Sequence, residues 1–163
     1  MANAFMPTDA VAHHTEMNAE EMWAKYRQLN LNAASYEAWS FCGGGEVGDR
    51  LANLVLEGKK TATASAHQLY MVEKAPLPSV GGLSIILWSN GEAACIIETT
   101  DVRVCKFSEV SPEHAYYEGE GNRSLEYWRK VHREAFSEEL EAHGLRFDED
   151  MLVVCETFLI AFR

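Results

Sequence analysis

The chain has 163 residues, a formal net charge of −11 and a hydrophobic fraction of 47%. This length and composition fit one globular domain that buries a core of its own. The charge argues against DNA as a partner, and against broad binding of long RNA, because such binding depends on cations that neutralise phosphates. The longest apolar run, near residues 83–88, is too short to cross a bilayer, so we expect no membrane partner.

Residues 1–17 show no periodic pattern and are expected to form a mobile N-terminal arm, followed by a single domain over residues 18–163. No lysine or arginine precedes Lys25, so the basic start of a secretory signal is missing. The cysteines have neither zinc-site spacing nor the density of a disulfide framework. We therefore expect a cytoplasmic protein with no metal and no cofactor. The cysteines are Cys42, Cys95, Cys105 and Cys155.

The first two predicted helices are bounded by capping signals. Asn18, with Glu21 three residues later, predicts a helix start, and residues 30–32 end that helix. A glycine-rich turn follows at Phe41–Gly45. The next helix carries leucine and valine at helical spacing over residues 51–55, and Gly58 ends it.

Strands are predicted after this helix. Thr61–Gln68 alternates hydroxyl and small side chains, and Leu83–Trp88 is short and apolar. Asn90-Gly91 is the strongest hairpin signal in the chain, which predicts that Ala93–Val104 returns antiparallel to the preceding strand.

The last third of the chain predicts two helices and a closing strand. Ser111-Pro112 marks a helix start, and that helix runs to Tyr117 or Glu118. A longer helix covers Ser124–Ala142, and Met151–Phe162 reads as a long strand. The order predicts an α+β fold with a mostly antiparallel sheet of five to six strands and flanking helices. Closure into a β-barrel would remove unprotected sheet edges.

The segment that follows Gly58 carries the strongest chemical signal. Thr61, Thr63 and Ser65 share one face of the predicted strand, while alanines occupy the other face. Lysines precede them, and residues 59–74 contain three lysines against one glutamate in an otherwise acidic chain. An anionic or small polar ligand suits this segment. A helix end followed by a half-buried surface strand is the alternative.

Lys60, Thr63 and Glu118 form a candidate catalytic set. Threonine becomes a nucleophile when a base takes its proton, and a lysine is such a base if its pKa is lowered. Glu118, beside Gly119, would orient the lysine or relay protons. Because residues three apart point to opposite faces of a strand, Lys60 must precede the regular pleat. A solvated acidic turn around Gly119 is the alternative for the glutamates.

Further candidates would bind the substrate. Tyr70 offers a ring that could stack on a nucleobase, and His132 lies four residues after Trp128 on one helix face. A histidine at the edge of the core remains the alternative for His132. The predicted substrate-binding residues are Lys59, Thr61, Ser65, Tyr70, Glu120, Arg129 and His132.

Four motifs, in this order, resemble the ASCH domain family. Asp49–Ser65 reads D-R-L-A-N-L-V-L-E-G-K-K-T-A-T-A-S, and Gly91–Val102 reads G-E-A-A-C-I-I-E-T-T-D-V. His114–His132 reads H-A-Y-Y-E-G-E-G-N-R-S-L-E-Y-W-R-K-V-H, and Glu156–Phe158 reads E-T-F. The resemblance covers nearly the whole chain and places it with members that carry the E-G-E-G element.

The resemblance implies a PUA-like β-barrel and a cleft for a nucleoside, nucleotide or single-stranded RNA. Some members are ribonucleases, and a shorter branch hydrolyses N(4)-acetylcytidine with a lysine, a threonine three residues later and a downstream glutamate. On this sequence those motif positions are Lys60, Thr63 and Glu118. If the motif is aligned in the other register, the glutamate is Glu120. Asn122 stands where such members usually carry aspartate. The resemblance therefore implies a metal-independent hydrolase, with a non-catalytic RNA- or nucleotide-binding module as the alternative.

Overall fold

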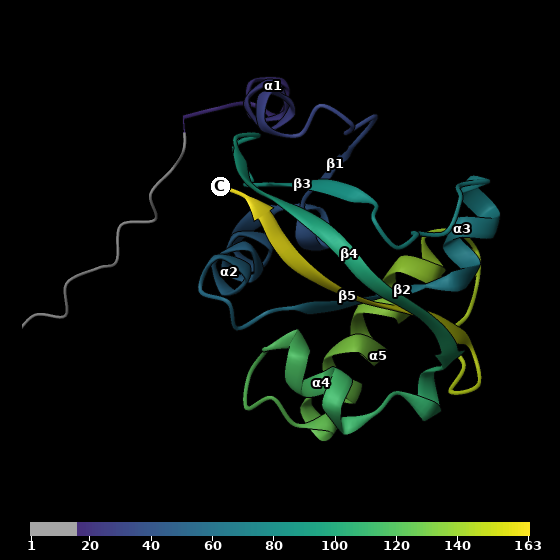
Figure 1. Ribbon diagram of the computed structural model, residues 1–163. Helices are drawn as coiled ribbons and strands as arrows, with labels where there is room; N and C mark the ends of the chain where they lie inside the picture. Colours follow the sequence, from purple (N-terminus) through teal and green to yellow (C-terminus); the bar gives the residue numbers. More distant parts are fainter. Residues whose placement is uncertain (1–15) are drawn as a thin grey trace, which may run out of the picture.

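The computed structural model describes residues 16–163, so the expected arm lies almost entirely outside the described residues. The carbonyl of Met17 accepts a hydrogen bond of 2.8 Å from the amide of Ala93. None of the helices described is long and apolar enough to span a membrane. The α-helices are α1 (Ala19–Leu29), α2 (Gly45–Leu56), α3 (His67–Glu73), α4 (Pro112–Glu118) and α5 (Leu125–Glu141), and single 3₁₀ turns cover Phe41–Gly43 and Phe107–Glu109 (Figure 1).

The strands form one curled sheet in the order β1-β3-β4-β5-β2. Three of the four strand pairs are antiparallel, and only β1 pairs with β3 in parallel. Register shifts within β3–β4 and β4–β5 strengthen the curl. The predicted α+β class and mostly antiparallel sheet are confirmed. The strands are β1 (Glu37–Trp39), β2 (Ala62–Ala66), β3 (Leu83–Leu87), β4 (Ala93–Lys106) and β5 (Leu152–Phe162).

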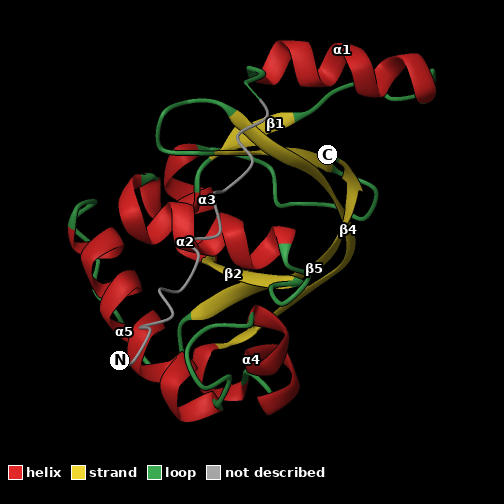
Figure 2. Ribbon diagram, turned by 90° about the vertical axis from the view of Figure 1, so that its left-hand side faces the viewer, coloured by secondary structure: helices red, strands yellow, loops and turns green. Residues whose placement is uncertain are grey.

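The sheet is a half-barrel, because β1 and β2 are its two edges and do not pair with each other in the described sheet. Figure 2 shows the strands curling around α2, with α1 at one end of the sheet and α4 and α5 at the other. Apolar side chains of α2 pack against the inner face of β3, β4 and β5. A helix therefore fills the space that full closure of the barrel would have enclosed.

The predicted helix starts are confirmed. The Asn18 side chain accepts from the Glu21 amide at 2.9 Å, while the Glu21 carboxylate accepts from the Asn18 amide at 3.0 Å. The hydroxyls of Ser111 and Ser124 each accept from the amide three residues later at 3.1 Å. These side chains satisfy amides that have no partner inside their helices.

Three local features differ from the sequence-based expectation. β2 ends at Ala66, and the chain enters α3 where the strand was predicted to reach Gln68. α2 begins at Gly45, inside the segment predicted as a turn, and β1 was not predicted at all. A seven-residue helix and a three-residue strand are too short for a periodic pattern to reveal them.

Backbone hydrogen bonds tie the end of α2 to the end of α4. The amides of Lys59 and Lys60 both donate to the carbonyl of Leu54, at 2.9 and 3.0 Å. The amide of Thr61 donates to the carbonyl of Tyr117 at 2.8 Å. The lysine segment therefore lies against the C-terminal end of α4, beside an apolar cluster built mainly from α5, β4 and β5.

Candidate functional site

Lys60 is a fully buried lysine, with 1% of its surface exposed. Its Nζ donates to Glu118 Oε2 at 3.0 Å and to Glu120 Oε1 at 3.1 Å, and it lies 5.2 Å from the centre of the Phe41 ring. Burying an ammonium is costly unless anions and hydrogen bonds compensate. The two carboxylates provide that compensation, which defines a buried charge cluster.

Glu118 is the centre of this cluster and is itself 1% exposed. Its Oε1 accepts from Trp128 Nε1 at 2.8 Å and from His114 Nε2 at 2.9 Å. Its Oε2 accepts from Lys60 and lies 3.4 Å from His132 Nε2. A carboxylate has about four acceptor directions. All four are occupied, so Glu118 orders its neighbours and has no direction free for a ligand.

His132 is held in one orientation from both sides. Its Nδ1 donates to the carbonyl of Trp128 at 2.9 Å, since a carbonyl can only accept. Its ring stacks on the Trp128 indole, with centroids 4.1 Å apart and planes at 15°. Its Nε2 therefore points to Glu118, and that contact is favourable when Nε2 carries a proton. The imidazole is an edge-of-core group that joins the charge cluster.

The cluster shifts the pKa of three of its members. Burial alone would lower the pKa of Lys60, but the charges of Glu118 and Glu120 raise it above its usual value. Burial would raise the pKa of Glu118, but Lys60 and His132 hold it well below its usual range. Burial would lower the pKa of His132, but Glu118 raises it. At neutral pH the structure therefore favours a lysine cation beside a carboxylate, and Glu118 favours the protonated form of His132.

A glycine sets the spacing between the two glutamates. Gly119 has φ +75°, and a Cβ there would lie 2.4 Å from the Lys59 carbonyl oxygen. The turn after α4 can approach the backbone of Lys59 and Lys60 this closely only without a side chain. Lys60 consequently lies between the carboxylates that flank Gly119.

The hydroxyl-bearing residues of β2 make a different set of contacts. Thr63 pairs directly with Glu156 on β5, so their side chains share a face. Ser65 and Tyr70 share a hydrogen bond of 2.8 Å. The Thr61 hydroxyl donates to the Tyr117 carbonyl at 3.4 Å. No hydrogen bond among the described residues joins Thr63 to Lys60, so the role of Thr63 stays a prediction.

Two other predicted residues lie outside the cluster. Lys59 pairs with Glu57 at 2.7 Å on the surface, and Arg129 donates to the Ser108 carbonyl at 3.2 Å. His114 was not predicted as a partner of Glu118. Their spacing of four within α4 was the signal that could have found it, because residues i and i+4 share a helix face.

A metal would have to share this cluster with a cation. One ligand atom each from Glu118, Glu120 and His132 lie within 4.8 Å of one another, a spacing that could hold an ion. Lys60 Nζ, however, already lies 3.0 and 3.1 Å from the two carboxylates. A divalent ion there would be repelled by the ammonium, so the donor set fits a metal poorly.

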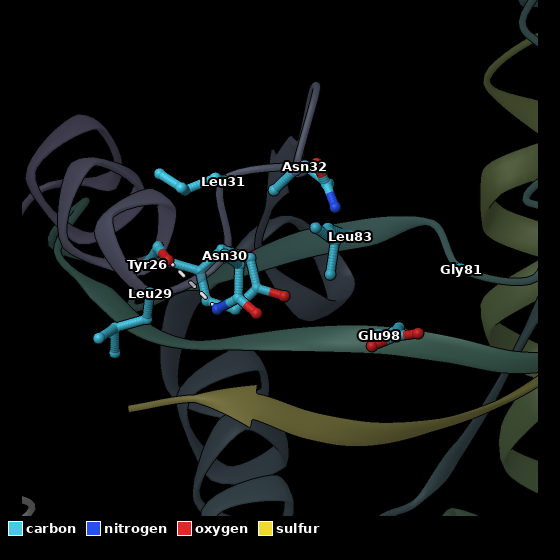
Figure 3. A pocket seen from close by; sticks show the side chains of 9 residues that line it. Tyr26, Leu29, Asn30, Leu31, Asn32, Gly81, Leu83 and Glu98 are labelled. Atoms are coloured by element: carbon cyan, nitrogen blue, oxygen red, sulfur yellow. Dashed lines mark hydrogen bonds between the residues drawn. The ribbon is translucent and has the colours of Figure 1, made fainter.

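Two cavities lie at opposite ends of the sheet. One, of about 470 Å³, lies where the C-terminal end of α1 meets β3 and β4 (Figure 3). Leucine and asparagine side chains form most of its wall, and Glu98 is the only charged residue among those lining it. The other, of about 360 Å³, is lined by Glu120, Gly119 and Lys59 among others. Only the second cavity adjoins the buried cluster, through Glu120.

The model of the ASCH domain matches residues 37–161. The chain belongs to the ASCH family. None of the curated proteins compared with it is similar in sequence. The ASCH domain from Lactobacillus crispatus JV V101 has a crystal structure that is 33% identical, with a TM-score of 0.83, over 91% of this chain and 98% of that one.

Two further solved structures share the fold of this ASCH domain. A protein of Enterococcus faecalis V583, described under the family model DUF984, is 35% identical with a TM-score of 0.80, over 88% of this chain and 87% of that one. The hypothetical protein PH0355 is 20% identical with a TM-score of 0.51, over 77% of this chain and 97% of that one. At that identity the third likeness concerns the fold alone.

Proposed function

We propose that this ASCH domain is a cytoplasmic, metal-independent hydrolase whose centre is the buried charge cluster, acting on a nucleoside, nucleotide or RNA end. The observation that carries the proposal is the Lys60 ammonium, held 3.0 and 3.1 Å from two carboxylates beside a histidine of raised pKa. Buried charges that shift one another's pKa are characteristic of catalytic sites. The E-G-E-G element at residues 118–121 supplies both of these carboxylates.

Glu120 is the group through which a ligand would reach Lys60. It lines the adjacent cavity and accepts a single hydrogen bond from Lys60, whereas Glu118 is saturated. An oxyanion that displaced the Glu120 carboxylate from Nζ would gain the lysine charge in a site of low dielectric, where such contacts are strong. Glu118 would act as a positioning residue that keeps Lys60 and His132 protonated.

The charge state favours cleavage of a phosphodiester. The RNA 2′-hydroxyl would attack phosphorus, Glu120 would take its proton, and the bond from phosphorus to the 5′-oxygen would break. Lys60 would stabilise the charge on the phosphorane and supply the proton of the departing oxygen, while His132 would keep Glu118 in place. These roles use Lys60 as a cation, which its raised pKa supports.

Amide hydrolysis is the second candidate, because Lys60 and Thr63 keep the spacing of the acetylcytidine-hydrolysing branch. Thr63 would attack the acetyl carbonyl, Lys60 would take its proton and return it to the departing cytosine amine, and Glu118 would hold Lys60 in place. Water would then release acetate from the threonine ester. This route needs Lys60 to lose its proton against a raised pKa, and it therefore ranks second.

Product analysis with two substrates separates the candidates. The purified chain is incubated with N(4)-acetylcytidine and, separately, with a short single-stranded RNA. Thr63→Ala should leave RNA cleavage unchanged but reduce amide hydrolysis by orders of magnitude. Glu120→Gln should reduce RNA cleavage. Thr100→Ala is the matched control, since Thr100 is an exposed threonine whose hydroxyl contacts only Thr157, at 2.9 Å, among the described residues.

The alternative of a binding module gives a different result. A chain that binds either ligand in a titration but forms no product would replace the hydrolase by a non-catalytic RNA- or nucleotide-binding domain. A chain that neither binds nor converts them would overturn both.

A further inference from the structure

The 360 Å³ cavity beside Glu120 gathers positive charge from three separate parts of the chain. Arg50 comes from α2, Lys59 from the turn before β2, and Arg123 from the loop before α5. Glu120 is the only acidic residue among those that line it. In a chain with a net charge of −11, this is a local excess of cations, and it attracts an anion of more than one charge.

The cationic groups retain donors for a ligand. Arg50 forms no ion pair with any described residue, and its side chain is exposed. Arg123 donates Nε to the Tyr116 carbonyl at 3.0 Å and Nη2 to the Lys59 carbonyl at 3.1 Å, so three of its five N–H groups remain. The ion pair of Lys59 with Glu57 is exposed on both sides, and such pairs exchange readily.

The remaining wall of the cavity suits the organic part of a nucleotide. Leu51, Leu54 and Tyr127 line it beside the cations. The Tyr127 ring is fixed against the backbone, because a Cβ at Gly121 would come within 2.5 Å of it. A rigid aromatic wall beside free arginine donors offers stacking to a base or sugar and paired hydrogen bonds to a phosphate.

We infer that this cavity is a phosphate subsite that binds the terminal phosphate monoester of a nucleotide or of a short RNA, with the sugar directed to Glu120. A monoester dianion matches three cations opposed by one carboxylate better than an internal diester, which carries one charge. The phosphate contact depends on the residues of the cavity alone. Only the identity of the attached nucleoside rests on the proposed function.

Calorimetric titration of the full chain tests the subsite. The probes are cytidine, cytidine 5′-monophosphate, a short RNA with and without a 5′-phosphate, and inorganic phosphate. The phosphorylated ligands should bind at least about tenfold more tightly than their unphosphorylated forms, the effect expected of charge-assisted hydrogen bonds. Arg50→Gln should reduce that ratio by about tenfold, and leave the Kd of cytidine unchanged.

Arg27→Gln is the matched control, because Arg27 is also an exposed helical arginine but lies on α1, at the other end of the sheet. Arg27→Gln should leave the affinity ratio of phosphorylated to unphosphorylated ligand unchanged, both for cytidine and for the short RNA. The preference for phosphate should also weaken as salt rises, since it depends on charge.

The outcomes separate the subsite from the proposed function. Equal affinity for cytidine and its monophosphate would overturn the subsite and leave the nucleoside site standing. Binding of inorganic phosphate that Arg50→Gln weakens, without binding of any nucleoside, would support the subsite and overturn the proposed ligand class. A preference for phosphate that Arg50→Gln and Arg27→Gln affect alike would overturn the assignment to this cavity.

Discussion

Glu118→Gln is the substitution that tests the buried charge cluster most directly. The amide keeps the size of the side chain but removes its charge, and its single oxygen accepts about two hydrogen bonds where the carboxylate accepts four. Two of the donors from Lys60, His114, Trp128 and His132 would then face an amide NH₂ group. The Lys60 ammonium would keep only Glu120 as its counter-ion.

The expected loss of stability is large. At 3.0 Å and an effective dielectric of about 20, the attraction between Lys60 and Glu118 is roughly 5 kcal/mol before desolvation is counted. Breaking a buried pair by removing one partner typically costs about 3–5 kcal/mol. We therefore expect Glu118→Gln to lower the free energy of unfolding by about that amount.

Urea unfolding at pH 7, followed by far-UV circular dichroism, measures the effect. In a double-mutant cycle, Lys60→Met combined with Glu118→Gln should cost less than the two single substitutions together, by about 2 kcal/mol or more. Asp150→Asn is the control, because Lys106 and Asp150 lie at a similar 3.1 Å on the surface. That substitution should leave the midpoint unchanged. A cost below about 1 kcal/mol for Glu118→Gln, or an additive cycle, would refute the buried cluster.

Three further predictions concern the backbone turn and the titrating groups. Gly119→Ala should destabilise the fold by more than about 2 kcal/mol, whereas Gly58→Ala, at φ +73° but facing open space, should cost only about 1 kcal/mol; equal midpoints in urea would contradict the close approach to Lys59. His132 has a folded pKa above its unfolded value, so its contribution is complete below about pH 6.5 and is lost as pH rises through the folded pKa. Stability measured across this range should fall with pH, and His132→Gln should remove the fall; an unchanged slope would show that His132 is not the titrating group. Burial raises the pKa of Glu156, so ionisation above its unfolded pKa destabilises the fold, and Glu156→Gln should raise the thermal midpoint at pH 7. A lowered midpoint would show that the Glu156 charge is compensated.

Features that depend on neighbours within about four residues could be predicted from the sequence alone. The pairing of Asn18 with Glu21 marked the start of α1, Ser111-Pro112 marked that of α4, and Asn90-Gly91 marked the hairpin between β3 and β4. Each of these is a local hydrogen-bond or dihedral preference, so no distant contact was needed to predict it. The Lys60 segment was also found this way, through its unusual composition and its motif.

The motif resemblance grouped Glu118 with Lys60, but the full set of contacts around Lys60 follows from the tertiary structure. Glu118 and Glu120 follow Lys60 by 58 and 60 residues along the chain. The backbone hydrogen bond from Thr61 to Tyr117 brings the two glutamates to Lys60. The edge strand β1 and the cavity that joins Arg50 to Arg123 likewise depend on segments distant in sequence. Composition shows that such groups exist, but the register and curl of the sheet set their separation. Since the strength of a charge–charge contact depends on that separation and on burial, the chemistry of this site is a property of the fold.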